Sequence, residues 1–244
     1  LKIAFPKLSD SEREAMALKN LESYGCALVD YSLIFFASKK RLSEQSVLLG
    51  KEYLDAAKDG TNTVILLSAH SVMMEFVPMQ ISAHYEMFGF FKTIKNPVLG
   101  WIVMRSRCRY ASMMVSREEG LRKMVKSMSP ERIMVFSPDE DLGRENAVFA
   151  PFYGKLKSTL TTGARLAKIK NAVVLPTFSY FDEVQQKYTT VIGPPLKNYP
   201  SEDAVADATT MNQALETLIS HKPEQYMWFM KFYYTHPEGE SPRY

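Results

Sequence analysis

A short apolar run over residues 63–68, Thr-Val-Ile-Leu-Leu-Ser, is the sequence feature that most constrains the fold of this chain. It is apolar and β-branched almost throughout, as is typical of a strand in a parallel sheet whose two faces are both covered. Strand-like and helix-like segments alternate along the rest of the chain. Alternation of this kind predicts an α/β domain in which helices flank a sheet.

Apolar spacing and turn residues predict the other elements. A capping box at Ser9 and Glu12 opens the first helix. The predicted helices cover residues 10–24, 26–38, 45–58, 72–89, 116–128, 161–169 and 201–220. The predicted strands cover residues 63–68, 101–110, 133–136 and 172–177, followed by a hairpin of 178–181 with 187–192. We expect a single domain over residues 1–244, with an N-terminal helical part (1–60) packed on an α/β core (61–244).

The composition excludes several classes of protein. With 244 residues, 46% hydrophobic and 23% charged, the chain has the balance of a folded globular protein. Its net charge of +3 does not by itself imply nucleic acid, and it favours acidic partners or anionic lipid surfaces. Two cysteines, Cys26 and Cys108, give no disulfide framework. No run approaches the roughly 20 apolar residues of a membrane span.

His70 and Glu75 follow the apolar run directly and are the main catalytic candidates. A histidine accepts protons near neutral pH, and a carboxylate can orient its ring and stabilise the charge that it gains. Residues five apart on one helix point about 140° away from each other, so this pair can meet only across a turn. A purely structural pair is the alternative. The spacing lacks the second histidine of a zinc motif, so we expect no metal.

Two further segments carry charged candidates. If residues 101–110 form a strand, Arg105, Arg107 and Arg109 share one face, where they could bind phosphate, stabilise an oxyanion or meet an acidic carrier protein. A solvated edge strand is the alternative. Asp139 and Asp141 lie in a loop after a predicted strand, where they could hold a metal or a basic group. A turn with helix-capping acids is the alternative reading.

Neither a phosphate-binding glycine loop nor a nucleophile elbow is present in the sequence. Direct attack by a substrate hydroxyl that His70 activates therefore fits the residues better than a covalent acyl-enzyme. An apolar segment over residues 26–38 ends in Lys39-Lys40-Arg41. It could lie on a membrane surface, or it could be a buried helix with a cationic end that suits its dipole.

Together these segments resemble the late acyltransferases of lipid A biosynthesis, the lauroyl and myristoyl transferases of Gram-negative bacteria. The resemblance covers nearly the whole chain, and its specificity comes from the order of the motifs. The matching segments are His70 to Glu75, Asn96 to Trp101 with Arg105 to Arg109, Pro138-Asp139-Glu140-Asp141-Leu142-Gly143, Phe149 to Tyr153, Thr161 to Gly163, Pro223 to Trp228 and Pro237 to Tyr244. The chain departs from the family pattern at Ala69, Met230 and Lys231. We expect the family's N-terminal hydrophobic anchor to have been trimmed from it.

The resemblance implies a glycerophosphate-acyltransferase-like α/β fold, a single-domain mixed sheet flanked by helices, and an enzyme without a cofactor. It implies acyl-acyl carrier protein as donor and a Kdo-bearing lipid A precursor as acceptor, at the cytoplasmic face of the inner membrane. His70 would be the general base and Glu75 its orienting acid. Arg107 and Arg109 would hold an acceptor phosphate or the oxyanion, and Asp139 and Asp141 would shape the site.

Two rival functions stay open at this point. One is acyl transfer to a simpler glycerophosphate or glycolipid acceptor by the same pair of residues. The other is a protein that keeps the fold and binds the carrier or a membrane without catalysis.

Overall fold

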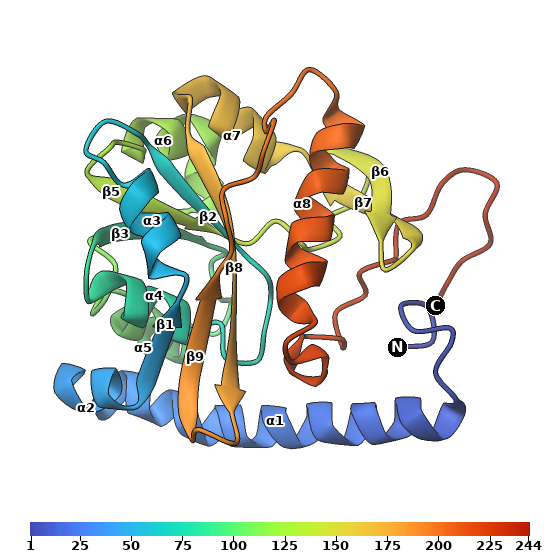
Figure 1. The fold of residues 1–244 in the computed structure, drawn as a ribbon, viewed down its shortest axis with the longest axis horizontal. Coiled ribbons are helices and arrows are strands. Elements are labelled where there is room, and N and C mark those ends of the chain that lie inside the picture. The colour runs from blue at the N-terminus through green and yellow to red at the C-terminus, as the bar shows by residue number, and fades with distance from the viewer.

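A seven-stranded mixed sheet lies at the centre of the computed structural model, which describes residues 1–244 (Figure 1). The strand order is β1-β9-β8-β2-β5-β3-β4. The five strands from β8 to β4 are parallel, and β1 pairs in parallel with β9, which is antiparallel to β8. The strands are β1 (Ser46–Leu49), β2 (Val64–Ser68), β3 (Glu86–Phe91), β4 (Met113–Ser116), β5 (Arg132–Phe136), β8 (Val173–Asp182) and β9 (Lys187–Ile192). The predicted α/β fold with a mixed sheet is confirmed.

Helices surround this sheet, and a separate hairpin of two strands lies beside it. The helices are α1 (Asp10–Phe36), α2 (Lys39–Glu44), α3 (Lys51–Ala57), α4 (Phe76–Ser82), α5 (Pro97–Arg107), η1 (Arg117–Glu119), α6 (Gly120–Ser127), α7 (Thr162–Lys170), α8 (Ala204–Ile219) and η2 (Pro223–Gln225). The hairpin consists of β6 (Ala147–Phe152) and β7 (Lys155–Leu160). None of the helices combines the length and the hydropathy that a membrane crossing requires.

β2 is buried on both faces, as its sequence predicts. Every residue of this strand is buried. Ile65 and Leu67 belong to a core cluster with side chains of α6, α7 and α8, whereas Val64 and Leu66 belong to a second cluster with α3 and α4. Burial of one such side chain stabilises a fold by about 1.5–3 kcal/mol. The two clusters therefore fix β2 in the middle of the sheet, and with it the residues that follow.

α1 crosses below the sheet, at the end toward which the arrow of β8 points (Figure 1). Its first turn has the predicted capping box between Ser9 and Glu12. It is one continuous helix, where the sequence suggested two. Ala27 and Ile34 of α1 are buried in a cluster with Phe76 of α4. α1 thereby covers the region just beyond the carboxyl end of β2.

Three predicted elements are wrong. Residues 101–110 form the end of α5 and the turn after it instead of a strand, because the Asn96 side chain caps the helix and Pro97 starts it. The predicted helix at 45–58 divides into β1 and α3 at Gly50, whose φ of 74° favours glycine and where a Cβ would lie 2.0 Å from the carbonyl oxygen of Ile192. The predicted helix at 72–89 divides into α4 and β3. The hairpin of β6 and β7 was not predicted.

Candidate active site

His70 and Asp139 meet at the carboxyl edge of the parallel sheet. His70 follows β2 and Asp139 follows β5, and these two strands are parallel neighbours. The Nδ1 atom of His70 lies 2.5 Å from Oδ1 of Asp139, and the His70 backbone N–H donates to Oδ2 at 2.8 Å. Because an ionised carboxylate can only accept, Nδ1 carries the proton in this contact. Nε2 of a neutral His70 is therefore free to accept a proton from a substrate.

Tyr226 completes the hydrogen bonding of the Asp139 carboxylate. Its hydroxyl donates to Oδ2 of Asp139 at 2.9 Å, and both residues are buried. The His70 carbonyl accepts from the backbone N–H of Met227 at 2.9 Å, which ties the same segment to the turn after β2. The Asn20 side chain of α1 also donates to the carbonyl of Tyr226 at 2.9 Å. The C-terminal segment is thus part of the site's framework.

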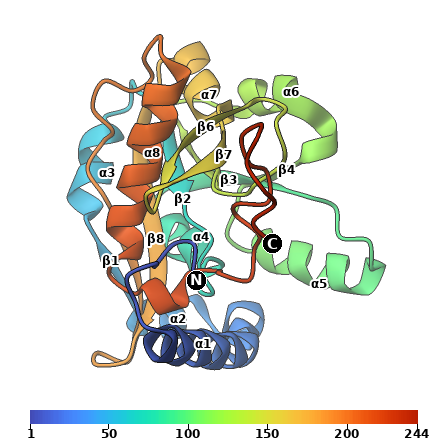
Figure 2. The same ribbon diagram turned by 90° about the vertical axis from the view of Figure 1, so that its right-hand side faces the viewer.

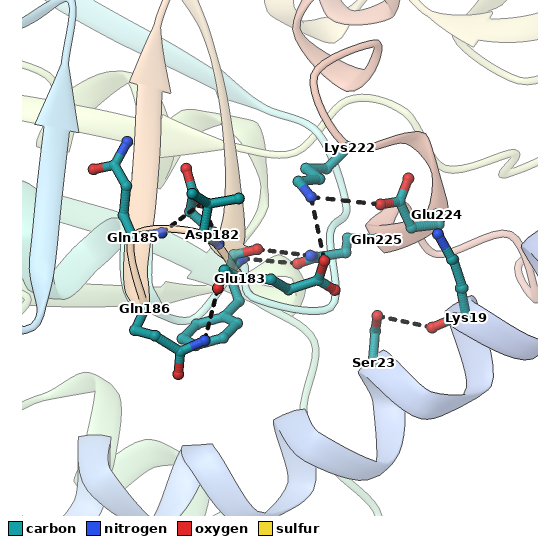
Figure 3. A network of polar contacts seen from close by, with 11 residues as sticks. Lys19, Ser23, Asp182, Glu183, Gln185, Gln186, Lys222, Glu224 and Gln225 are labelled. Atoms are coloured by element: carbon teal, nitrogen blue, oxygen red, sulfur yellow. Dashed lines mark hydrogen bonds and ion pairs between the residues drawn. The ribbon is translucent and has the colours of Figure 1, made fainter.

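Gln225 fixes the position of Tyr226 from the preceding residue (Figure 3). Its side-chain amide exchanges two hydrogen bonds of 2.8 Å with the backbone of Phe181 in β8. Figure 3 also shows Lys222 between two acids, with its Nζ 3.6 Å from Glu183 and 3.9 Å from Glu224. The Gln225 amide is buried and makes two short hydrogen bonds, whereas both Lys222 contacts are longer than 3.5 Å and Glu183 is exposed. Gln225 therefore ties β8 to the segment that carries Tyr226.

The contact between His70 and Asp139 raises the pKa of the histidine and lowers the pKa of the acid. Burial lowers the pKa of His70, but the charge and hydrogen bond of Asp139, helped by Glu140, outweigh burial and raise this pKa above its ordinary value of 6.5. Burial raises the pKa of Asp139, but the charge and hydrogen bonds of His70 outweigh it, and this pKa falls below 3.8. Asp139 is therefore ionised at neutral pH, and it stabilises the imidazolium that forms when His70 accepts a proton.

Lys157 of β7 is a fully buried cation beside these acids. Burial lowers its pKa to about 8, although the charges of Asp139, Asp141 and Glu140 favour its protonated form. Its Nζ donates to the carbonyl of Ser158 at 3.2 Å. Nothing in the local sequence pattern distinguishes it from its exposed neighbour Lys155. In the fold it partly offsets the negative charge of the acidic loop.

Glu75, predicted to orient His70, makes no hydrogen bond to the His70 ring and pairs with Arg107 instead. Glu75 precedes α4, and its carboxylate accepts two bonds from the Arg107 guanidinium, one of them from Nε at 3.0 Å. The turn between His70 and α4 is held by α1, because the Tyr31 hydroxyl donates to the carbonyl of Val72 at 2.6 Å. With a cation opposite Glu75 and Asp139 already at Nδ1, the contact that orients the imidazole belongs to Asp139.

The three arginines predicted to share one face do not do so. In α5 and the turn after it, alternate residues point in different directions. Arg109 donates to the carbonyls of Ile34 and Ala37, at 2.5 and 2.9 Å, so it caps the C-terminal end of α1 and does not reach the site. Arg105 is exposed and stacks on Trp101, with 5.5 Å from its guanidinium carbon to the ring centroid.

Asp141 lies close to the site and binds backbone N–H groups instead of His70. Its carboxylate accepts the backbone N–H of Gly143 at 3.1 Å and that of Thr235 at 2.7 Å. It therefore holds the C-terminal segment against the loop after β5. Asp139 contacts His70 directly, so the two acids of this motif have different tasks.

A cavity of about 280 Å³ opens beside His70. Its charged lining consists of Glu75, Lys92, Arg107, Arg117 and Glu140, besides His70, and Nη2 of Arg117 lies 2.6 Å from Oε2 of Glu140. The sequence reasoning missed Arg117, whose only signal is its place just after β4. The rest of the lining is mainly apolar and includes Met74, Pro78, Met87, Phe90, Phe91, Ile94, Ala111, Met114, Val135 and Phe136. A reactive group at the edge and an apolar interior suit a substrate with a hydrocarbon chain.

The ion pair of Glu75 with Arg107 gives the first testable prediction. Glu75→Gln leaves a partly buried guanidinium without its partner, which we expect to cost about 1–3 kcal/mol of unfolding free energy. The double variant Glu75→Gln/Arg107→Met should lose less than the sum of the single variants. Urea denaturation of the four proteins measures this coupling.

The same variant tests whether Glu75 only lines the cavity or also orients the His70 ring. We expect Glu75→Gln to leave the acidic limb of the pH–rate profile in place, because Asp139 sets the His70 pKa. A limb that moves to lower pH in Glu75→Gln would return the orienting role to Glu75.

Comparison with known proteins gives matches of one kind along nearly the whole chain. The model of a family described as bacterial lipid A biosynthesis acyltransferase matches residues 1–235. The chain is 28% identical to the lipid A biosynthesis lauroyltransferase of Escherichia coli K12, over 100% of this chain and 80% of that protein. It is 31% identical to a lipid A biosynthesis acyltransferase of Haemophilus influenzae, over 99% and 78%. It is 29% identical to the lipid A biosynthesis palmitoleoyltransferase of Escherichia coli K12, over 100% and 79%.

Proposed function

The chain belongs to the family of bacterial lipid A biosynthesis acyltransferases, and on this premise we propose that it transfers a lauroyl or myristoyl chain from acyl-acyl carrier protein to a lipid A precursor. The acceptor in this proposal bears Kdo, and the accepting group is the 3-hydroxyl of one of its acyl chains. The observation that carries the proposal is the His70–Asp139 pair at the edge of an apolar cavity.

The chemistry needs only one placed base. His70 takes the proton of the acceptor hydroxyl at Nε2, and the oxygen attacks the carbonyl carbon of the thioester. A new C–O bond forms, the C–S bond breaks, and the proton passes from His70 to the leaving thiolate. Asp139 holds the required tautomer and stabilises the imidazolium during the reaction.

Cations at the cavity are the candidates for binding negative charge. Arg107 and Arg117 line the same cavity as His70, and each has an acid as its present partner. We propose that one of them exchanges this partner for an acceptor phosphate or for the oxyanion of the tetrahedral intermediate. Arg109 is left out of this role, because its guanidinium is engaged with α1.

The apolar part of the cavity suits the acyl chain of a substrate. Gly89 of β3 lines it, and a Cβ at that position would lie 3.6 Å from Cε of Met114. Methionine side chains adapt readily to different apolar shapes. The named relatives include a lauroyltransferase and a palmitoleoyltransferase, so the length of the transferred chain is a question for experiment.

Acyl transfer with defined donors and acceptors tests the proposal. We expect label to pass from lauroyl- or myristoyl-acyl carrier protein to the Kdo-bearing precursor, and to pass poorly from the corresponding coenzyme A thioesters. Mass spectrometry of the product identifies the chain and the hydroxyl that receives it. Efficient transfer to glycerol 3-phosphate or to a glycolipid without Kdo would replace this acceptor. Donor and acceptor binding with no turnover in any combination would indicate a non-catalytic protein.

The proposed location of the protein is the cytoplasmic face of the inner membrane. Two features support it: the proposed acceptor is a lipid, and Lys39, Lys40 and Arg41 at the start of α2 follow the exposed apolar residues of α1. One side of α1 is buried through Ala27 and Ile34, while Leu28, Val29 and Phe36 face outward. The segment is therefore buried on one side, and its exposed apolar residues support the proposed contact with a membrane surface.

A further inference from the structure

α5 is an apolar helix that the rest of the chain leaves almost uncovered. It contains Val98, Leu99, Trp101, Ile102, Val103 and Met104, yet Ser106 is the only buried residue among its eleven. Figure 2 shows α5 standing out from the body of the protein at the end of a long connection from β3. A helix of this composition normally packs its apolar side chains against a core. Here Val98, Leu99 and Trp101 are all more than half exposed.

The chain segment that contains α5 carries charge of a single sign. Between Glu86 and Glu118 the chain contains no acidic residue, and it contains six cations, which are Lys92, Lys95, Arg105, Arg107, Arg109 and Arg117. The end of α1 lies against α5, since Phe35 and Phe36 line a groove of about 1040 Å³ together with Trp101 and Met104. Three more cations, Lys39 to Arg41, follow that end. Large apolar side chains surrounded by cations match an anionic lipid surface.

The catalytic cavity opens toward the same helix. A hollow of about 310 Å³ beside α5 shares Phe91, Lys92, Ile94 and Arg107 with the cavity at His70. The same hollow shares Met104 with the groove between α1 and α5. The three depressions therefore adjoin one another between α5 and His70.

We propose that α5 and the adjoining end of α1 insert into the headgroup region of an anionic lipid layer and form the entrance through which the lipid acceptor reaches His70. This inference rests on the proposed function for the identity of the acceptor. An acidic protein partner would also meet the cations. The apolar side chains of α5, however, are exposed around most of the helix, and a fluid lipid layer can surround a helix in a way that one face of a folded protein cannot.

Vesicle binding tests this entrance without any turnover. The protein has two tryptophans, and Trp101 is 63% exposed whereas Trp228 is half-buried. With vesicles of phosphatidylcholine and phosphatidylglycerol that carry brominated acyl chains, we expect quenching of emission in wild type and little quenching in Trp101→Phe. Binding should weaken as salt is raised, and it should be weaker still to phosphatidylcholine alone.

Matched substitutions locate the binding surface. Leu99→Ser on α5 should weaken partitioning by about tenfold, while Ile169→Ser on α7, a residue with the same 55% exposure, should not change it. Lys95→Gln should weaken it by about fivefold, while Lys197→Gln, which is also exposed, should not.

Equal effects in the test and control variants, or emission from Trp101 that brominated lipid does not quench, would overturn the proposal. Loss of carrier-protein binding in Leu99→Ser with unchanged vesicle binding would also overturn it, in favour of a carrier-docking surface. Because none of these measurements requires acyl transfer, a negative result leaves the proposed reaction standing, and failure of the reaction leaves the lipid-binding result standing.

Discussion

His70→Gln should lower kcat for acyl transfer by about 10²–10⁴-fold, the contribution usual for a placed general base. Glutamine has a similar length, and its amide N–H can still donate to Asp139, so the buried carboxylate keeps a partner. The loss then reflects the missing proton acceptor. Single-turnover measurement of label transfer from acyl carrier protein gives this rate directly.

His84→Gln is the matched control for this variant. His84 is exposed and lies beyond the end of α4, outside the catalytic cavity. It should keep wild-type activity, and both variants should keep the wild-type melting temperature within a few degrees. A His70→Gln enzyme that retains full turnover would end the case for general-base catalysis at this site.

Asp139→Asn should reduce kcat by a comparable factor, about 10²–10⁴-fold, because the imidazole loses the carboxylate that fixes its tautomer and stabilises its charge. The acidic limb of the pH–rate profile should also move. In wild type, Asp139 raises the pKa of His70 above 6.5 against the effect of burial. Without this charge, burial dominates, the pKa of His70 falls, and the limb shifts to lower pH.

The difference in stability between wild type and Asp139→Asn should depend on pH. His70 has a raised pKa in the folded state, so its contribution is fully present below 6.5 and is lost as pH rises through the folded-state value. Asp139 has a depressed pKa, so its contribution is present above 3.8 and is lost as pH falls through the folded-state value. The difference in unfolding free energy between wild type and variant should therefore be largest between about pH 3.8 and 6.5.

Asp141→Asn distinguishes the role of Asp141 from that of Asp139. Asp141 holds the backbone of Thr235 and Gly143 and does not contact His70. This variant should lose stability while the limb of the pH–rate profile stays where it is. If Asp141→Asn moves the limb and Asp139→Asn does not, the assignment of the orienting acid is wrong.

Local pattern was sufficient where neighbouring residues alone decide the structure. The capping box at Ser9, the apolar run of β2 and the helical spacing of α8 each depend on contacts within a few residues, and all three are confirmed. Local pattern failed for α5. Its apolar residues show no clear period because the folded chain does not bury one side of it. The alternation of Arg105, Arg107 and Arg109 then resembled a strand.

The sequence by itself determined the fold class, the place of His70 after a buried strand, and the set of motifs that indicates the family. Only the tertiary structure decided which acid contacts the His70 ring. Glu75 is five residues away but points to Arg107, whereas Asp139 is 69 residues away and lies at Nδ1. The physical reason is the pairing of β2 with β5, which brings their carboxyl ends to one edge of the sheet. Strand order depends on the packing of the whole domain, and no spacing along the chain encodes it.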